Sequence, residues 1–297
     1  PPGLDPAQAA VNPLWTMLRV DRAAPEGGCA AGRTTPLGGF STFAMHGTGN
    51  PGENDLQDAD IHGIIASRLE HQTDWLGGHT PAHLPEAVQL VANGAEGDVS
   101  PDYPVQSRCD LPALEPVLRP GGLRSPPAWD WVHPNPAAAA ACISVARGYI
   151  TAAGDTLARR AFALYQRLEA DLRGDYTIAV TSSVLWLRRD AVALGVCTTP
   201  MVGTSTAAGA EDGPSRFLGF RFLGLIPVGI EEGGRAIRRP PKGCQREKNR
   251  ILNMAVAHHA LPELAPLTVA RIGPVALATV PGEPTTMTGV HIQRAVA

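Results

Sequence analysis

Short apolar runs recur along this chain, each ending in a loop rich in glycine, proline and polar residues, and they alternate with stretches of helical periodicity. This alternation is typical of α/β proteins, in which helices pack against sheets. The chain contains 32 glycines and 28 prolines, about a fifth of its 297 residues, without the G-X-Y period of a fibre. The sequence therefore predicts an α/β fold with mixed β-sheets flanked by helices and joined by many loops.

The hydrophobic pattern places the individual elements. Runs of alternating or β-branched apolar residues predict strands at residues 14–18, 39–45, 85–92, 176–186, 267–272 and 275–280. Gly273 and Pro274 between the last two runs predict a hairpin. Apolar residues at helical spacing predict helices over residues 60–72, 136–173, where Gly154 is a possible break, and from residue 290 onward. No interior linker divides the chain, so a single domain is expected.

Charge and cysteine content exclude several classes of protein. The formal net charge is -3, so the chain lacks the basic field that concentrates nucleic acid, and no nucleic-acid partner is expected. No run approaches the roughly 20 apolar residues of a membrane span, and no signal peptide is visible. The five cysteines are widely spaced without a C-x-x-C pair, which excludes a zinc ribbon and is compatible with one disulfide or none.

Three loops at predicted strand ends each present a reactive side chain: His46, Ser100 and Glu283. A histidine and a carboxylate are part of the common protein shell of a catalytic zinc. Each residue also has a structural interpretation: a hydrogen-bonded strand-end histidine, a turn serine, and a carboxylate at a helix N-terminus. The loop around Ser100 does not fit the G-x-S-x-G pattern of α/β-hydrolases.

Other residues that suggest metal binding are interpreted as structural. Asp58, Asp60 and His62 alternate at the start of a predicted helix, where acids usually cap or are solvated. Two further pairs of histidines do not align two ligands, because Pro81 lies between the members of one pair and the members of the other are adjacent. These are His79, His83, His258 and His259.

Five segments resemble the neutral/alkaline, non-lysosomal ceramidase family, in the family's order along the chain. The strongest are FAMHGT at 43–48, GDVSP at 97–101 and VPGEPTTMTG at 280–289, which resemble the family's F-A-x-H-P-T, GDVSPN and VPGEFTTMAGR segments. Two others, AAGAEDGP at 207–214 and CQREK at 244–248, resemble its AAGTxDGP and C-x-x-x-K regions.

The resemblance implies a function that the residue pattern alone leaves open. It implies a zinc-dependent amidase that hydrolyses the N-acyl bond of ceramide to a sphingoid base and a fatty acid, with His46 and Glu283 as zinc ligands and Ser100 as the catalytic serine. Either Ser100 or a zinc-bound hydroxide is the attacking group. Asp98 is expected to orient the Ser100 loop by accepting backbone hydrogen bonds. A ceramide or related N-acyl lipid substrate, contact with a membrane or micelle surface, and a secreted or extracytoplasmic location are further expectations.

The departures from the family pattern keep alternatives open. Gly47, Asp102 and Pro284 replace the family's proline, asparagine and phenylalanine. Two further family ligands, a histidine in an H-T-H-S segment and a later tyrosine, have no counterpart in residues 1–297. The chain is therefore expected to be an internal portion of one catalytic domain, without the N-terminal part and the C-terminal immunoglobulin-like domain. The alternatives are a catalytically silent lipid-binding homologue and an amidase for other N-acyl lipids.

Overall fold

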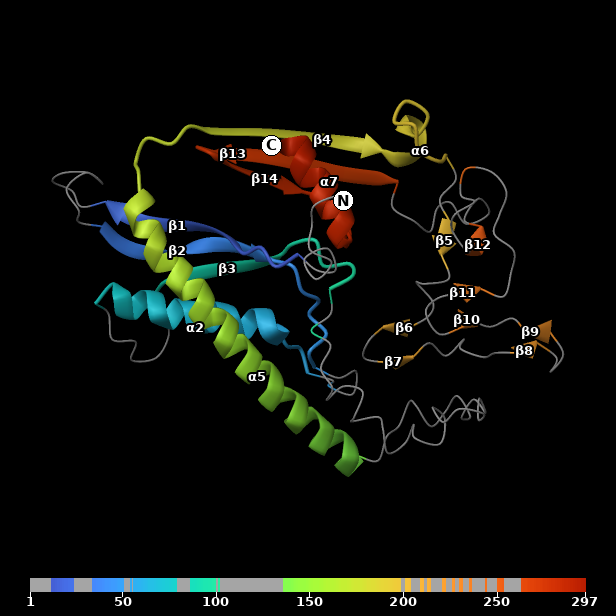
Figure 1. Cartoon of the computed structure of the whole chain (residues 1–297), viewed down its shortest axis with the longest axis horizontal. Helices are drawn as coiled ribbons and strands as arrows, with labels where there is room; N and C mark the ends of the chain where they lie inside the picture. Colours follow the sequence, from blue (N-terminus) through green and yellow to red (C-terminus); the bar gives the residue numbers. More distant parts are fainter. Residues whose placement is uncertain are drawn as a thin grey trace. The chain divides into compact units, whose positions relative to one another are not determined.

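The structure is a computed structural model, which describes part of the chain (Figure 1). The described residues are 12–23, 34–50, 54, 56–78, 86–99, 101, 136–198, 244 and 263–297, together with short strand segments between 201 and 253. Packing divides the chain into two compact units. One comprises Pro1–Tyr103, Ile143–Thr181 and Thr268–Ala297, and the other comprises Pro104–Cys142 and Ser182–Leu267.

A three-stranded mixed sheet in the first unit carries two of the loops singled out above (Figure 1). It contains β1 (Thr16–Ala23), β2 (Thr34–Phe43) and β3 (Val88–Asn93) in the order β1-β2-β3. β1 and β2 are antiparallel, whereas β2 and β3 are parallel. Parallel neighbours need a crossover, and α2 (Asp60–Leu76) lies in it. The predicted α/β fold with mixed sheets is confirmed.

The core of this unit lies between the sheet and two helices, α2 and α5 (Pro136–Arg167). Its buried side chains come from β1, the segment just after β2, α2 and α5. They are Met17, Met45, Ile61, Ile65, Leu69, Ala158, Ala161 and Tyr165. α5 is not broken at Gly154. That glycine instead lets the helices approach, because a Cβ there would lie 2.6 Å from the Ile64 Cγ2 atom.

A buried ion pair explains why β1 runs beyond its predicted end at residue 18. Arg19 and Asp21 stand on the same face of β1, and each side chain is 2% exposed. Arg19 donates to both Asp21 carboxylate oxygens at 2.8 Å. Its guanidinium also lies 4.7 Å from the centre of the Tyr165 ring, on α5. Charged residues that end a strand in a sequence-based prediction here continue it, because they are neutralised against the helix.

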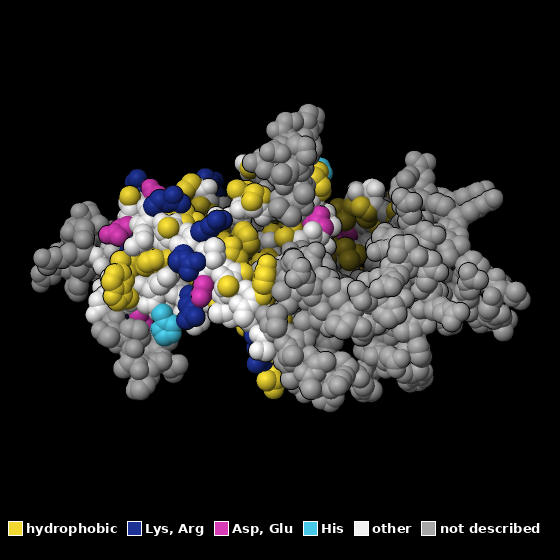
Figure 2. All heavy atoms as spheres, turned by 60° about the horizontal axis from the view of Figure 1, so that its bottom comes forward, with side chains coloured by type: hydrophobic (Ala, Val, Ile, Leu, Met, Phe, Trp, Pro, Cys, Tyr) yellow, Lys and Arg dark blue, Asp and Glu magenta, His cyan; other side chains and the backbone are white. Residues whose placement is uncertain are grey.

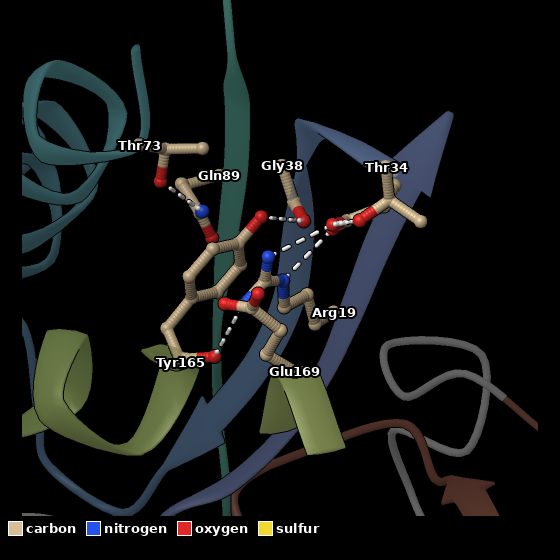
Figure 3. Close-up of polar contacts among 8 residues, drawn as sticks. Arg19, Thr34, Gly38, Thr73, Gln89, Tyr165 and Glu169 are labelled. Atoms are coloured by element: carbon tan, nitrogen blue, oxygen red, sulfur yellow. Dashed lines mark hydrogen bonds and ion pairs between the residues drawn. The ribbon is translucent and has the colours of Figure 1, made fainter. Parts of the chain in front are cut away.

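Tyr165 extends this polar network across the sheet (Figure 3). Its hydroxyl donates to the Gly38 carbonyl oxygen at 3.0 Å, and nearby Gln89 donates to Thr73 at 2.9 Å. Burial is the main reason that the pKa of Tyr165 rises to about 12. Tyr165 therefore stays neutral and acts as a hydrogen-bond donor that joins α5 to β2.

A second sheet has the order β14-β13-β4, with β4 at Ile178–Trp186, β13 at Leu264–Ile272 and β14 at Val275–Thr279. β13 and β14 form the predicted hairpin, and Gly273 adopts φ 54° at its turn. α7 (Thr286–Val296) follows β14 and begins four residues earlier than predicted. The short helices η2 (Leu168–Asp171) and α6 (Leu187–Asp190) flank β4 in the sequence.

Short antiparallel strand pairs make up the described part of residues 201–253. β5 (Met201–Gly203) pairs with β12 (Arg250–Asn253). The other pairs are β6 (Gly209–Ala210) with β7 (Gly213–Pro214), β8 (Arg221–Phe222) with β9 (Ile226–Pro227), and β10 (Ile230–Glu231) with β11 (Arg235–Ala236). Cys197 and Cys244 form a disulfide. The sequence left the choice between one disulfide and none open.

The described surface is mixed in character. On the face drawn in Figure 2, basic and acidic side chains are interspersed with hydrophobic ones. Within the described residues, no helix combines the length and the apolar composition that a bilayer-spanning segment requires.

Candidate functional site

The loops that follow β2 and β3 are joined by backbone hydrogen bonds, and this junction places His46. The His46 amide donates to the Val99 carbonyl oxygen at 2.8 Å, and the Gly94 amide donates to the Phe43 carbonyl oxygen at 3.0 Å. The parallel strands β2 and β3 end side by side, with Phe43 opposite Asn93. Their loops therefore leave the same edge of the sheet, which is where sites are commonly built in α/β proteins. His46 is half-buried.

The loop between β14 and α7, which contains Glu283, docks on the β3 loop. The Gly97 amide donates to the Pro284 carbonyl oxygen at 3.0 Å. A Cβ at Gly97 would collide with the backbone carbonyl of Glu283, so only glycine fits this approach. The replacement of the family's phenylalanine by Pro284 leaves this bond intact, because the acceptor is a backbone carbonyl.

The Asp98 side chain also joins the β3 loop to the segment that contains Glu283. Its Oδ1 atom accepts hydrogen bonds from the Thr286 amide at 2.6 Å and from the Thr286 hydroxyl at 2.8 Å. The sequence predicted that Asp98 accepts backbone hydrogen bonds to orient the Ser100 loop. It does accept a backbone bond, and the donor lies 188 residues away at the start of α7.

These contacts bear on the structural interpretation of Glu283. The carboxylate at the N-terminus of α7 is that of Asp98, where it satisfies a free amide and offsets the helix dipole. Glu283 precedes the helix and is exposed. Thr285 is the N-cap residue of α7, and its hydroxyl accepts the Thr288 amide at 3.5 Å. Because Asp98 accepts the Thr286 amide, capping of α7 does not use the Glu283 carboxylate.

A third acidic residue, Glu96, belongs to this cluster and was missed by sequence reasoning. It is 6% exposed, and its Oε2 atom has no hydrogen-bond partner among the described residues. Burial, the largest cause, raises the pKa of Glu96; Glu283 adds to the rise, whereas its own backbone amide and His46 oppose it. Both predicted ligands thus act electrostatically on Glu96. The one signal in the sequence was its position in the glycine-rich loop that carries Ser100.

The structure describes only some of the other residues that were considered as candidate ligands or catalytic groups. Ser100 lies outside the described residues, although its neighbours Val99 and Pro101 are both buried. His79, His83, His258 and His259 also lie outside them. Asp58 and Asp60 are structural, as predicted: the Asp58 Oδ1 atom accepts the Asp60 amide at 2.7 Å.

The donors present fit a zinc ion in kind, since His46 offers an imidazole nitrogen and Glu283 and Glu96 offer carboxylate oxygens. The unpartnered buried oxygen of Glu96 is the type of atom that a bound cation satisfies. However, no three His, Cys, Asp or Glu side chains in the described part of the chain lie close enough together to hold a metal ion. A catalytic zinc takes three protein ligands, so the described residues do not by themselves form a complete shell.

Fold and site together define an α/β protein whose candidate site is built from three loops, two of them at the ends of parallel strands. Comparison with known families identifies the chain more closely. Residues 129–297 match the family described as neutral/alkaline non-lysosomal ceramidase, N-terminal. The chain belongs to this family, as its motifs predicted. Glu283 lies within the matched residues.

Individual relatives extend the similarity to nearly the whole chain. A neutral ceramidase of Mycobacterium tuberculosis (strain ATCC 25618 / H37Rv) is 26% identical over 298 residues, covering 97% of this chain and 40% of the relative. A structure described as a ceramidase complexed with C2 has a TM-score of 0.56 at 21% identity, over 99% of this chain and 40% of its own. The neutral ceramidase of Pseudomonas aeruginosa has a TM-score of 0.52 at 19% identity, over 99% and 38%.

These structures share the fold of this chain. The chain spans about two fifths of the length of the relatives that it matches.

Proposed function

We propose that the protein carrying this chain is a zinc-dependent amidase that hydrolyses the N-acyl bond of ceramide to a sphingoid base and a free fatty acid. Membership of the ceramidase family supports the reaction class. The observation that carries the assignment to this site is the convergence of the His46 and Glu283 loops on the segment that leads to Ser100. Three segments that the sequence separates are joined by hydrogen bonds at one edge of a sheet.

In this proposal His46 and Glu283 hold the ion, and further ligands complete the shell. A bound zinc polarises an amide carbonyl and lowers the pKa of a bound water, chemistry that a poor electrophile such as an amide requires. Ser100 either attacks the carbonyl or positions the amide for attack by water. The bonds from Asp98 to Thr286 and from Gly97 to Pro284 hold the serine loop against the Glu283 loop.

The proposal extends to location and to the lipid surface. A secreted or extracytoplasmic location is supported by the Cys197–Cys244 disulfide, because disulfides persist in oxidising compartments. Peripheral contact with a membrane or micelle is supported by exposed apolar side chains after β4. Val192 is 78% exposed and Val196 is 54% exposed, and Arg188 and Arg189 are nearby in the sequence.

The test is Glu283→Ala in the full-length protein, with zinc content and ceramide hydrolysis measured on the same preparation. We expect both to fall at least about tenfold, because one of the few zinc ligands is lost. Glu263→Ala is the matched control, since Glu263 makes a surface ion pair with Arg188 at 3.6 Å and lies outside the three loops. Undiminished zinc content in Glu283→Ala would remove the ligand assignment.

A catalytically silent lipid-binding homologue is the second candidate. It is favoured by Gly47, Asp102 and Pro284, which replace residues of the family's pattern in the loops that carry the candidate site. Ceramide turnover by the full-length protein that is lost in Ser100→Ala would exclude it. An amidase that prefers other N-acyl lipids would be recognised in the same assay by faster turnover of those amides.

A further inference from the structure

The carboxylate of Asp60 binds the loop that directly follows His46. Asp60 is the first residue of α2 and is 5% exposed. Its Oδ1 atom accepts the Gly49 amide at 3.1 Å and its Oδ2 atom accepts the Asn50 amide at 2.7 Å. The Ile61 amide also donates to Oδ1, at 2.7 Å. Both oxygens of one buried carboxylate are thus used on backbone amides, two of them in the loop after His46.

The backbone of Asp60 is strained to make these contacts. Its φ is 52°, and it is the one non-glycine residue with a positive φ in the described part of the chain. This left-handed conformation is uncommon for a non-glycine residue, although aspartate adopts it more readily than most. The Asp58 carboxylate supports this conformation by accepting the Asp60 amide at 2.7 Å. Backbone strain persists where the surrounding structure requires it, and it is concentrated at functional sites.

The bound loop is also confined by packing. A Cβ added to Gly49 would lie 2.5 Å from the Ile150 Cγ2 atom of α5 and 2.7 Å from the Asp60 Oδ1 atom. Gly49 therefore lies tightly between the start of α2 and α5. The preceding His46 amide is held at 2.8 Å by Val99. The short segment between residues 46 and 50 is fixed at both of its ends.

The first turn of α2 also lies near the end of β3, the strand that precedes the Glu96 loop. Burial lowers the pKa of His62, whereas Asn93, the last residue of β3, raises it less strongly, so the His62 side chain lies near the end of β3. The start of α2 therefore binds the loop after β2 and lies near the end of β3.

We propose that Asp60 is a positioning residue, which holds the segment 46–50 and thereby fixes the position of the His46 side chain. It touches neither substrate nor metal in this role. The catalytic meaning of the proposal rests on the proposed zinc amidase function, whereas the effect on the His46 loop is a property of the fold.

The chain offers a matched control at the other end of α2. Asp74 is 4% exposed, and its carboxylate likewise accepts two backbone amides, those of Glu86 at 2.8 Å and Ala87 at 2.7 Å. Those amides precede β3, away from the His46 loop. Asp60→Asn and Asp74→Asn remove the same chemistry, because an amide nitrogen cannot accept the second N–H bond.

The experiment compares the two variants in the full-length protein. Three quantities are measured: amide hydrogen exchange of residues 46–50, the rate at which diethyl pyrocarbonate modifies His46, and zinc affinity by competition with a chelator. We expect both variants to lose similar stability. Asp60→Asn alone should speed exchange at Gly49 and Asn50, change the modification rate of His46, and weaken zinc binding by about tenfold.

The outcomes separate the positioning role from the function. Equal exchange and equal His46 modification in the two variants would overturn the inference, and so would equal zinc affinity in two variants that bind zinc. If the unaltered protein binds no zinc, the proposed function fails, and the exchange and modification rates still decide whether Asp60 positions His46. Should Asp60→Asn not fold, Asp60→Gly replaces it, because glycine accepts the positive φ without the carboxylate.

Discussion

Replacing Asp21 by asparagine should expose how strongly the buried ion pair supports the packing of α5. The variant removes the charge that faces Arg19, whose side chain is 2% exposed. Breaking a buried pair by removing one partner costs about 3–5 kcal/mol. The remaining contacts of Arg19 are the Tyr165 carbonyl oxygen at 3.2 Å, the Tyr165 ring, and Glu169, whose side chain is 64% exposed. Since these compensate in part, we expect a loss near 3 kcal/mol.

The pKa of Arg19 is consistent with this expectation. Burial, the largest single cause, lowers the pKa of Arg19, but the hydrogen bonding and charge of Asp21 together with Tyr165 and Glu169 outweigh burial and raise it. The guanidinium is therefore charged in the folded protein. Once Asp21 is neutral, that charge remains buried without a full counter-ion.

The assay is urea unfolding of the variant, a double variant and a control. The double variant Arg19→Met/Asp21→Leu should lie within about 1 kcal/mol of the parent, because an apolar pair of similar volume leaves no charge behind. The control is Asp155→Asn, which breaks the exposed Arg68–Asp155 pair (2.7 Å) and should cost less than about 1 kcal/mol. The reasoning fails if Asp21→Asn costs no more than the control, or if the double variant is as unstable as Asp21→Asn.

Three further predictions concern the packing of α5 on α2 and two buried ionisable side chains. Gly154→Ala should destabilise by about 1–3 kcal/mol in thermal unfolding, whereas Gly148→Ala on the same helix, with nothing within 4 Å of the added Cβ, should not. Burial lowers the pKa of His62 below 6.5, so stability should fall as the pH drops below that value, and His62→Gln should flatten the profile. Burial raises the pKa of Glu96 above 4.5, so ionisation of its carboxyl group lowers the free energy of unfolding as the pH rises. Without zinc, Glu96→Gln should therefore be more stable than the parent protein at neutral pH and no more stable in acid.

The local pattern of the sequence was sufficient for the elements and for part of the site. The stripe at Ile61, Ile65 and Leu69 predicts α2 because helical periodicity is a local property, and these residues are buried in the core. The motifs around His46 and Glu283 were found in the same way, and the structure brings their loops to one cluster. The position of Ser100 in that cluster stays a prediction, since this residue lies outside the described part.

Where local pattern misled, the cause was a partner distant in the chain. Arg19 and Asp21 ended a predicted strand because exposed charges are expected at strand ends. The structure buries them as a pair against Tyr165, 146 residues from Arg19. Gly154 likewise looked like a helix break, and its actual role is to admit the Ile64 side chain of another helix.

By itself, the sequence determined the class of fold, the order of the elements and the loops that present His46 and Glu283, because periodicity, turn residues and motifs are properties of short segments. Only the tertiary structure shows that Asp98 accepts the Thr286 amide at the start of α7, that Asp60 accepts the Gly49 amide of the His46 loop, and that Glu96 is buried with both predicted ligands acting on its pKa. Each of these roles depends on a hydrogen bond or charge contributed by another segment. The register of the sheet and the packing of the helices determine such contacts, and neither can be inferred from residues that are adjacent in the sequence.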